Sequence, residues 1–179
     1  DLYALGAFTF AEGAILYSSF AFLKHFQSQG KNKLLNVVSG INFSARDEAL
    51  HSEASGWLFQ QLLKEKREAK EITAEEEETL EATIKDMAHV VYEHEQQIIS
   101  KLFEKGEIEG ISEKQLDYFV QSRINTCMRN MGYHNVFDVK YNPVGDWFYK
   151  GINGYAMNDF FNSVGNQYER GWTAEEFAF

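Results

Sequence analysis

A glutamate and a histidine at helical spacing are the residues of this chain best suited to chemistry. Glu48 and His51 lie three positions apart in the segment ARDEALH, residues 45–51. On an α-helix, positions i and i+3 share one face, with their Cβ atoms about 5–6 Å apart. A carboxylate oxygen and an imidazole nitrogen can then bind the same metal ion, and together they suit iron or manganese. This spacing also arises by chance on solvated helices, so its surroundings decide what it means.

The segment that positions this pair is predicted to be a long helix, residues 33–66. Its core-facing stripe advances in steps of three and four residues through Val37, Ile41, Ser44, Glu48, His51, Ser55, Leu58 and Leu62. We therefore expect Glu48 and His51 to face the core. Burying an unpaired carboxylate is costly, so a cation or a hydrogen-bond network should lie beside Glu48.

A third candidate ligand lies on the preceding predicted helix, residues 2–29, which we expect to stop at Gly30. The apolar stripe of this helix consists of Leu5, Phe8, Glu12, Ile15 and Ser19. Glu12 is the only charge in it. A buried salt bridge would require an inward Arg or Lys, and neither stripe supplies one. The two helices therefore favour a metal site formed by Glu12, Glu48 and His51.

Two further helices and a tail complete the predicted organisation. Capping-box sequences open the two helices, and these are Thr73 with Glu76 and Ser112 with Gln115. Helical periodicity then fades from Tyr133 onward. We expect an all-α fold, with a helical bundle over residues 1–132 and an irregular C-terminal tail over residues 133–179.

Other residues with reactive side chains are weaker candidates. His89 is predicted to be exposed, because helix geometry points it about 200° away from the apolar stripe of its helix. His94 lies on that stripe, but a lone inward histidine is more often a hydrogen-bonded core residue than a ligand. Its neighbour Glu95 could be buried against polar groups. Cys127 has no base nearby in the sequence that would activate it.

Charge and composition exclude several functions. The net charge of −10 argues against nonspecific binding of nucleic acid, which needs clustered positive charge. No apolar run approaches the ~20 residues that cross a bilayer, so we expect no membrane partner. The single cysteine cannot form an internal disulfide, which favours the reducing cytoplasm.

The segment at residues 45–51, with Glu12 in an aromatic helix upstream, resembles the small, radical-generating subunit of class I ribonucleotide reductase. The resemblance covers most of the chain, including Glu95 and Tyr168. It implies a ferritin-like bundle whose two iron ions, or manganese in their place, serve to generate a tyrosyl radical. A large subunit would use that radical to reduce ribonucleotides to deoxyribonucleotides.

Carried over residue by residue, the resemblance implies specific roles. Glu12, Glu48 and His51 match three metal ligands. Asp47 matches the carboxylate that orients the histidine of the other iron and lies on the route of electron and proton transfer. Tyr168 matches the tail tyrosine that relays the radical between subunits.

The resemblance also implies supporting roles. Arg46 would anchor Asp47 or neighbouring carboxylates, and Phe20 would line the apolar pocket that shields the radical. Ser44 stands where a larger aliphatic residue is expected. The acidic, aromatic end, residues 175–179, resembles the peptide that docks into the large subunit.

One departure from the family is important. The family's site also uses an Asp, a Glu, a His and a radical tyrosine from an earlier part of the chain, and only eleven residues precede Glu12 here. We therefore expect the C-terminal half of a small subunit, acting with an N-terminal half, a large subunit and a second small subunit in a homodimer. The alternatives are another ferritin-like two-metal oxidase or iron-storage subunit, or a non-catalytic assembly partner.

Overall fold

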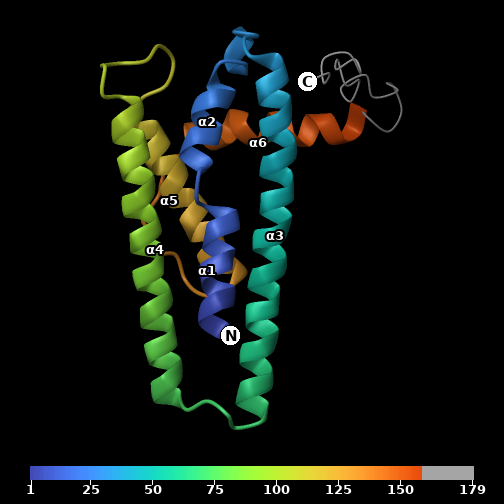
Figure 1. Cartoon of the computed structure of the whole chain (residues 1–179), viewed down its shortest axis with the longest axis vertical. Coiled ribbons are helices and arrows are strands. Elements are labelled where there is room, and N and C mark those ends of the chain that lie inside the picture. Colours follow the sequence, from blue (N-terminus) through green and yellow to red (C-terminus); the bar gives the residue numbers. More distant parts are fainter. Residues whose placement is uncertain (159–179) are drawn as a thin grey trace, which may run out of the picture.

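The structure, a computed structural model, describes residues 1–158 and is helical throughout that range apart from short links (Figure 1). The elements are α1 (Leu2–Gly13), α2 (Tyr17–His25), the 3-10 helix η1 (Ser28–Gly30), α3 (Leu35–Glu68), α4 (Ala74–Leu102), α5 (Glu113–Asn130) and α6 (Pro143–Asn158). Within residues 1–158 there is no strand, only an isolated bridge between Ile108 and Ile111. The prediction of an all-α fold is confirmed.

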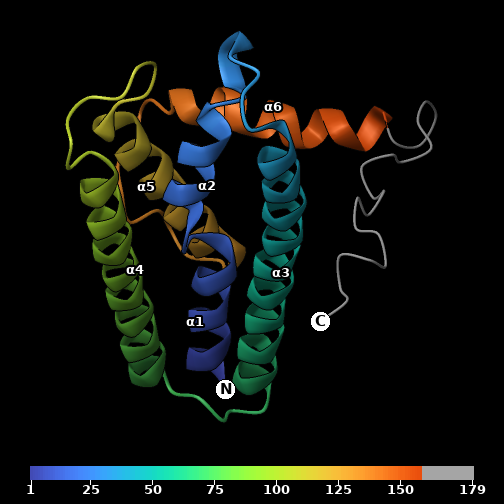
Figure 2. The ribbon, with the colours of Figure 1, turned by 45° about the horizontal axis from the view of Figure 1, so that its top comes forward.

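Two long helices frame the molecule. α3 and α4 run antiparallel and are joined by a short link at the bottom of Figure 1, while α1 and α2 lie between them. α5 packs behind α1 and α4, and α6 crosses the upper end of the bundle (Figure 2). This arrangement places α1 directly against α3, and these two helices carry the candidate ligands.

The capping boxes predicted from the sequence are present. Thr73 Oγ1 accepts the Glu76 N–H at 3.2 Å, and the Glu76 carboxylate accepts the Thr73 N–H at 2.8 Å. Ser112 and Gln115 form the same reciprocal pair at 3.2 and 3.0 Å. Each box satisfies backbone donors that have no partner inside the helix, which explains why α4 and α5 begin where they do.

The prediction of one continuous helix over residues 2–29 was wrong. α1 ends at Gly13 and α2 begins at Tyr17, and Leu16 between them adopts a left-handed conformation with φ 67°. The apolar pattern continues across this break, so periodicity alone could not reveal it. The groups that stabilise the break come from α4 and α5, which are distant in the sequence.

The prediction of an irregular tail also needs correction, because α6 lies inside residues 133–179. Asn142 Oδ1 accepts the Gly145 N–H at 3.0 Å, and Pro143 occupies the first turn, where a missing N–H costs nothing. Val144 and Phe148 then insert into the core. The sequence signal for this helix was Asn142 and Pro143 followed by two apolar residues four positions apart, Val144 and Phe148. Residues 159–179 lie outside the described part of the chain.

The N-terminal stretch is more apolar than we expected. Among the described residues, Leu2–His25 is one span of 24 residues that is long and apolar enough for a membrane helix by length and composition, since an 18-residue window within it has a mean hydropathy of 1.3. In the structure this stretch is broken at Leu16 and lies between α3, α4 and α5, and its Lys24 and His25 are buried. A core helix meets the same criterion, so the stretch is weak evidence for a membrane span.

Candidate metal centre

Three side chains from two helices meet at one point on the bundle. His51 Nδ1 on α3 lies 3.0 Å from Glu12 Oε2 on α1 and 3.3 Å from Glu48 Oε2 one turn earlier on α3. Each residue offers a ligand atom within 4.8 Å of the other two. The structure thus brings together the three residues that the sequence singled out, in an arrangement that could hold a metal ion.

Small residues allow α1 and α3 to approach closely at this point. A Cβ on Gly13 would lie less than 3.0 Å from Ser52 Oγ and from Cys127 Sγ, so this position needs glycine. Ser52 Oγ donates to the Thr9 carbonyl at 2.9 Å, one turn earlier on α1. Because Glu12 precedes Gly13 and His51 precedes Ser52, this contact sets the two ligands opposite each other.

We had expected the candidate ligands to lie in the core, and this prediction was wrong. The side chains of Glu12, Glu48 and His51 are 22%, 35% and 54% exposed, respectively. The buried face of α3 is instead formed by Val38, Ile41, Asn42, Ala45, Ser52, Ser55, Gly56, Phe59 and Leu63. This face contains small and polar residues that permit close helix contact, so hydropathy did not identify it.

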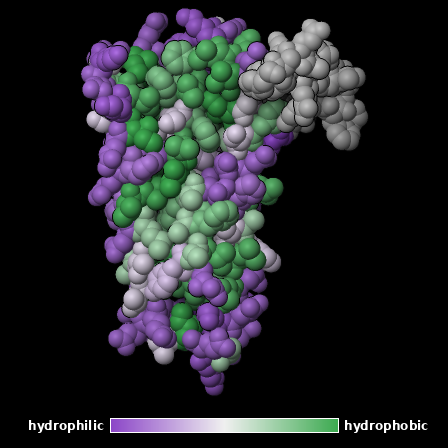
Figure 3. Space-filling model, viewed as in Figure 1, coloured by the Kyte–Doolittle hydropathy of each residue, from purple (hydrophilic) through white to green (hydrophobic). Residues whose placement is uncertain are grey.

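The face that carries the ligands is partly apolar. Phe8, Leu16, Val37 and Leu58 are each close to half exposed. Figure 3 shows hydrophobic side chains gathered along the central band of the molecule in the view of Figure 1, where α1 and α2 lie in front, with hydrophilic residues along both edges. The stripe predicted to face the core is therefore only partly buried, because Ile41 and Ser55 are buried whereas Val37, Glu48, His51 and Leu58 are not.

Electrostatics at the cluster favour a positive charge between the three groups. The hydrogen bond with Glu48 is the main cause that lowers the pKa of Glu12, and the same hydrogen bond raises the pKa of Glu48. The hydrogen bond with Glu12 raises the pKa of His51. Two carboxylates and an imidazole thus lie within hydrogen-bonding reach of one another, and a metal cation bound between them would be attracted by both carboxylates. Two carboxylates and one imidazole, with no thiolate, are donors that suit iron or manganese.

Among the residues assigned supporting roles, Arg46 and Asp47 directly precede Glu48 on α3, but not all of the expected contacts are present. Asp47 is exposed on α3. The guanidinium of Arg46 lies over the ring of Phe43, 5.5 Å from its centroid, and the described residues show no ion pair between Arg46 and Asp47. Phe20 is half-buried with its ring 5.5 Å from that of Tyr17. Tyr168 and residues 175–179 lie outside the described residues.

His89, His94 and Cys127 were weaker candidates by sequence, and their surroundings in the structure support that ranking. His89 is exposed, as predicted, and its ring lies 5.6 Å from that of Phe137. His94 is not an inward residue, because its side chain is 49% exposed, whereas Glu95 beside it is fully buried. Cys127 is buried, and burial raises the pKa of its thiol, which keeps the reactive thiolate scarce.

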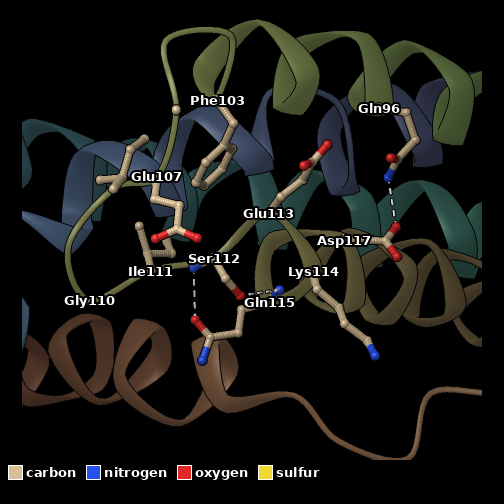
Figure 4. A pocket seen from close by; sticks show the side chains of 12 residues that line it. Gln96, Phe103, Glu107, Gly110, Ile111, Ser112, Glu113, Lys114, Gln115 and Asp117 are labelled. Carbon is tan, nitrogen blue, oxygen red and sulfur yellow. Dashed lines mark hydrogen bonds between the residues drawn. The ribbon is translucent and has the colours of Figure 1, made fainter.

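A pocket lies away from the cluster, between the C-terminal end of α4 and the start of α5 (Figure 4). It is an open hollow of about 1060 Å³ whose lining includes Gln96, Phe103, Glu107 and Lys114. Asp117 in its wall already accepts the Gln96 side-chain amide at 2.7 Å and the Tyr92 hydroxyl at 2.8 Å. Asp117 and Gln96 are thus used to hold α4 and α5 together, and we assign no ligand to the pocket.

A helical bundle that gathers carboxylates and a histidine from neighbouring helices is the pattern of ferritin-like proteins. The comparison with known families makes the assignment specific. Residues 2–143 match the family model described as ribonucleotide reductase, small chain, and the chain belongs to that family.

Individual relatives agree with the family assignment. The chain is 28% identical over 169 residues to the ribonucleoside-diphosphate reductase subunit beta of Bacillus subtilis, covering 93% of this chain and 47% of that protein. It is 26% identical over 161 residues to a probable ribonucleoside-diphosphate reductase small subunit of Invertebrate iridescent virus 3, covering 90% of this chain and 41% of that protein. The chain spans about half the length of the relatives it matches.

A solved structure supports the fold. The crystal structure of a putative class I ribonucleotide reductase from Bacillus halodurans superposes with a TM-score of 0.64 at 24% identity, covering 80% of this chain and 44% of that chain. The ferritin-like helical fold predicted from the sequence is confirmed.

Proposed function

We propose that this chain provides one half of the two-metal centre of a class I ribonucleoside-diphosphate reductase small subunit. The convergence of Glu12, Glu48 and His51 in a chain of this family is the observation that carries the proposal. In this role the three side chains are metal ligands, and an Asp, a Glu and a His on another segment complete the centre. When bound, two iron ions, or manganese in their place, supply the oxidising power that converts a tyrosine to a radical.

The open face supports this division of the site. All three ligands are partly exposed, and large apolar side chains such as Phe8, Val37 and Leu58 are exposed on the same two helices. A second helical segment that carried the missing ligands would cover this apolar surface and shield the centre from water. Burial of such surface is the main favourable contribution when helices associate.

The further roles follow from the family. Asp47 would orient the partner segment's histidine, which is the common function of a carboxylate beside a metal ligand. Tyr168 would relay the radical towards the large subunit, into which residues 175–179 would dock. The large subunit would then reduce ribonucleotides to deoxyribonucleotides. The assembly would contain two small subunits and work in the cytoplasm.

Metal binding by variants of the full chain tests this proposal. Free Mn²⁺ is quantified by its electron paramagnetic resonance signal while the protein is titrated. We expect Glu48→Ala to weaken Mn²⁺ binding by about tenfold or more, because it removes a charged ligand. Glu65→Ala, on an exposed part of the same helix, is the matched control and should bind as the wild type does. Equal binding by the Glu48→Ala variant would remove Glu48 from the site.

A further inference from the structure

The backbone break between α1 and α2 directly follows the candidate ligand Glu12. The N–H groups of Ala14 and Ile15 both reach the Phe10 carbonyl, at 2.9 and 3.2 Å, and Leu16 then turns into the left-handed region. A break of this kind leaves carbonyl groups of the first helix and N–H groups of the second without helical partners. Buried groups of this sort need partners from elsewhere in the fold.

The start of α2 is satisfied by a buried carboxylate from α4. Glu95 is fully buried, and its Oε1 accepts the Leu16 N–H at 2.8 Å while its Oε2 accepts the Ser18 N–H at 2.9 Å. Both oxygens are therefore used on one helix N-terminus. A negative charge at this position is also favoured by the helix dipole, whose N-terminal end is positive. His94 Nδ1 lies 3.3 Å from Oε1 and adds a further polar neighbour.

The end of α1 is satisfied by a buried cation from α5. Arg123 is buried, and its Nε donates to the carbonyl of Gly13, the last residue of α1, at 2.9 Å. Its guanidinium lies 4.2 Å from the centroid of the Tyr17 ring and donates to the Tyr149 hydroxyl at 3.1 Å. No carboxylate forms an ion pair with Arg123 among residues 1–158. The guanidinium therefore complements a helix C-terminus, which is the negative end of the dipole.

The two charges thus bracket the break, each with the sign that its helix end favours. Glu12 directly precedes Gly13, whose carbonyl accepts the hydrogen bond from Arg123. On the other side, Tyr17 follows Leu16 and donates its hydroxyl to the Ala45 carbonyl at 3.1 Å, three residues before Glu48. The break is therefore tied to the ligand-bearing stretch of α3 as well as to α4 and α5.

We propose that Glu95 and Arg123 are positioning residues for the metal centre. They hold the break between α1 and α2 and so fix the carboxylate of Glu12 opposite Glu48 and His51. This inference rests on the proposed metal-binding function. It differs from a purely stabilising role because it predicts that loss of the contacts of either side chain weakens metal binding even where the chain remains folded.

Conservative substitutions separate the two roles. In Glu95→Gln the shape is kept, but an amide NH₂ would oppose one of the two backbone N–H groups that the carboxylate accepts. We expect Mn²⁺ affinity to fall by about tenfold, the usual scale for loss of a charge-assisted hydrogen bond. We also expect faster hydrogen exchange of the Leu16 and Ser18 amides. Arg123→Lys should weaken Mn²⁺ binding as well, because a lysine lacks the planar guanidinium that holds Gly13, Tyr17 and Tyr149 together.

A matched control uses a carboxylate with a similar structural role elsewhere. Asp117 accepts hydrogen bonds from Tyr92, Gln96 and Gln121 between α4 and α5, and none of these partners belongs to α1, α2 or the break. Asp117→Asn should lower the melting temperature but leave Mn²⁺ affinity unchanged. If the wild-type chain binds Mn²⁺ and Glu95→Gln binds it equally well, the positioning role is overturned while the metal site stands. If the wild-type chain binds no Mn²⁺, the proposed function fails and this inference fails with it.

Discussion

His51 Nδ1 lies 3.0 Å from Glu12 Oε2, although 39 positions separate the two residues in the sequence. The contact joins the end of α1 to the middle of α3, and it exists because Gly13 and Ser52, the next residue on each helix, pack without an intervening side chain. The candidate metal centre therefore depends on a helix contact made by small residues. Its consequences for stability and binding can be tested one residue at a time.

Gly13→Ala should both destabilise the fold and weaken the metal centre. The added Cβ would meet Ser52 Oγ and Cys127 Sγ at less than 3.0 Å, so α1 must move away from α3 or α5. Overpacking of this kind costs about 1–3 kcal/mol, which urea unfolding would measure. Gly40→Ala on α3 is the control, because a Cβ there meets nothing within 4 Å. Replacing a glycine inside a helix should stabilise that variant by about 0.5–1 kcal/mol. Equal behaviour of the two variants would contradict the close contact.

Lys24 should make stability depend on pH in the alkaline range. Burial lowers the pKa of Lys24 to about 8 from its ordinary 10.5, so between these values the unfolded chain binds the proton more tightly than the folded chain. Stability linked to this residue therefore rises as the pH increases through that window, by about 1–3 kcal/mol. Unfolding in urea at several pH values would measure the rise.

The variant Lys24→Met removes the titrating group and should lose this part of the pH dependence. Lys105→Met, at an exposed position, should retain it. A wild-type chain whose stability falls steadily from pH 8 to pH 10, with Lys24→Met following the same curve, would show that Lys24 is not buried as a lysine.

Cys127 should be unreactive in the folded chain. The thiol is fully buried and burial raises its pKa, so a thiol reagent can reach it only when the chain opens. We expect labelling to be at least about a hundredfold slower under native conditions than in denaturant. A Ser44→Cys variant supplies an exposed thiol in the same protein for comparison. Rapid labelling of Cys127 in the native wild type would mean that the contact between α1, α3 and α5 is loose.

Much of the fold could be predicted because its signals are local. The capping boxes at Thr73 and Ser112 fixed the starts of α4 and α5, and the spacing of Glu48 and His51 identified the candidate ligands. The break at Leu16 could not be predicted, because its stability comes from Glu95 and Arg123 on distant helices. The buried face of α3 was missed for a different reason. Its close contacts need small polar residues such as Ser52, which a hydropathy pattern does not mark as buried.

The most direct test of the metal centre follows the ring protons of the five histidines by nuclear magnetic resonance while Mn²⁺ is added. The paramagnetic ion broadens signals that lie close to it. At substoichiometric Mn²⁺, the His51 signals should broaden first, and Glu12→Gln should reduce that broadening. Signals of His25, His89, His94 and His134 should remain sharp. Uniform broadening of all five histidines, or none at His51, would contradict a metal site formed by Glu12, Glu48 and His51.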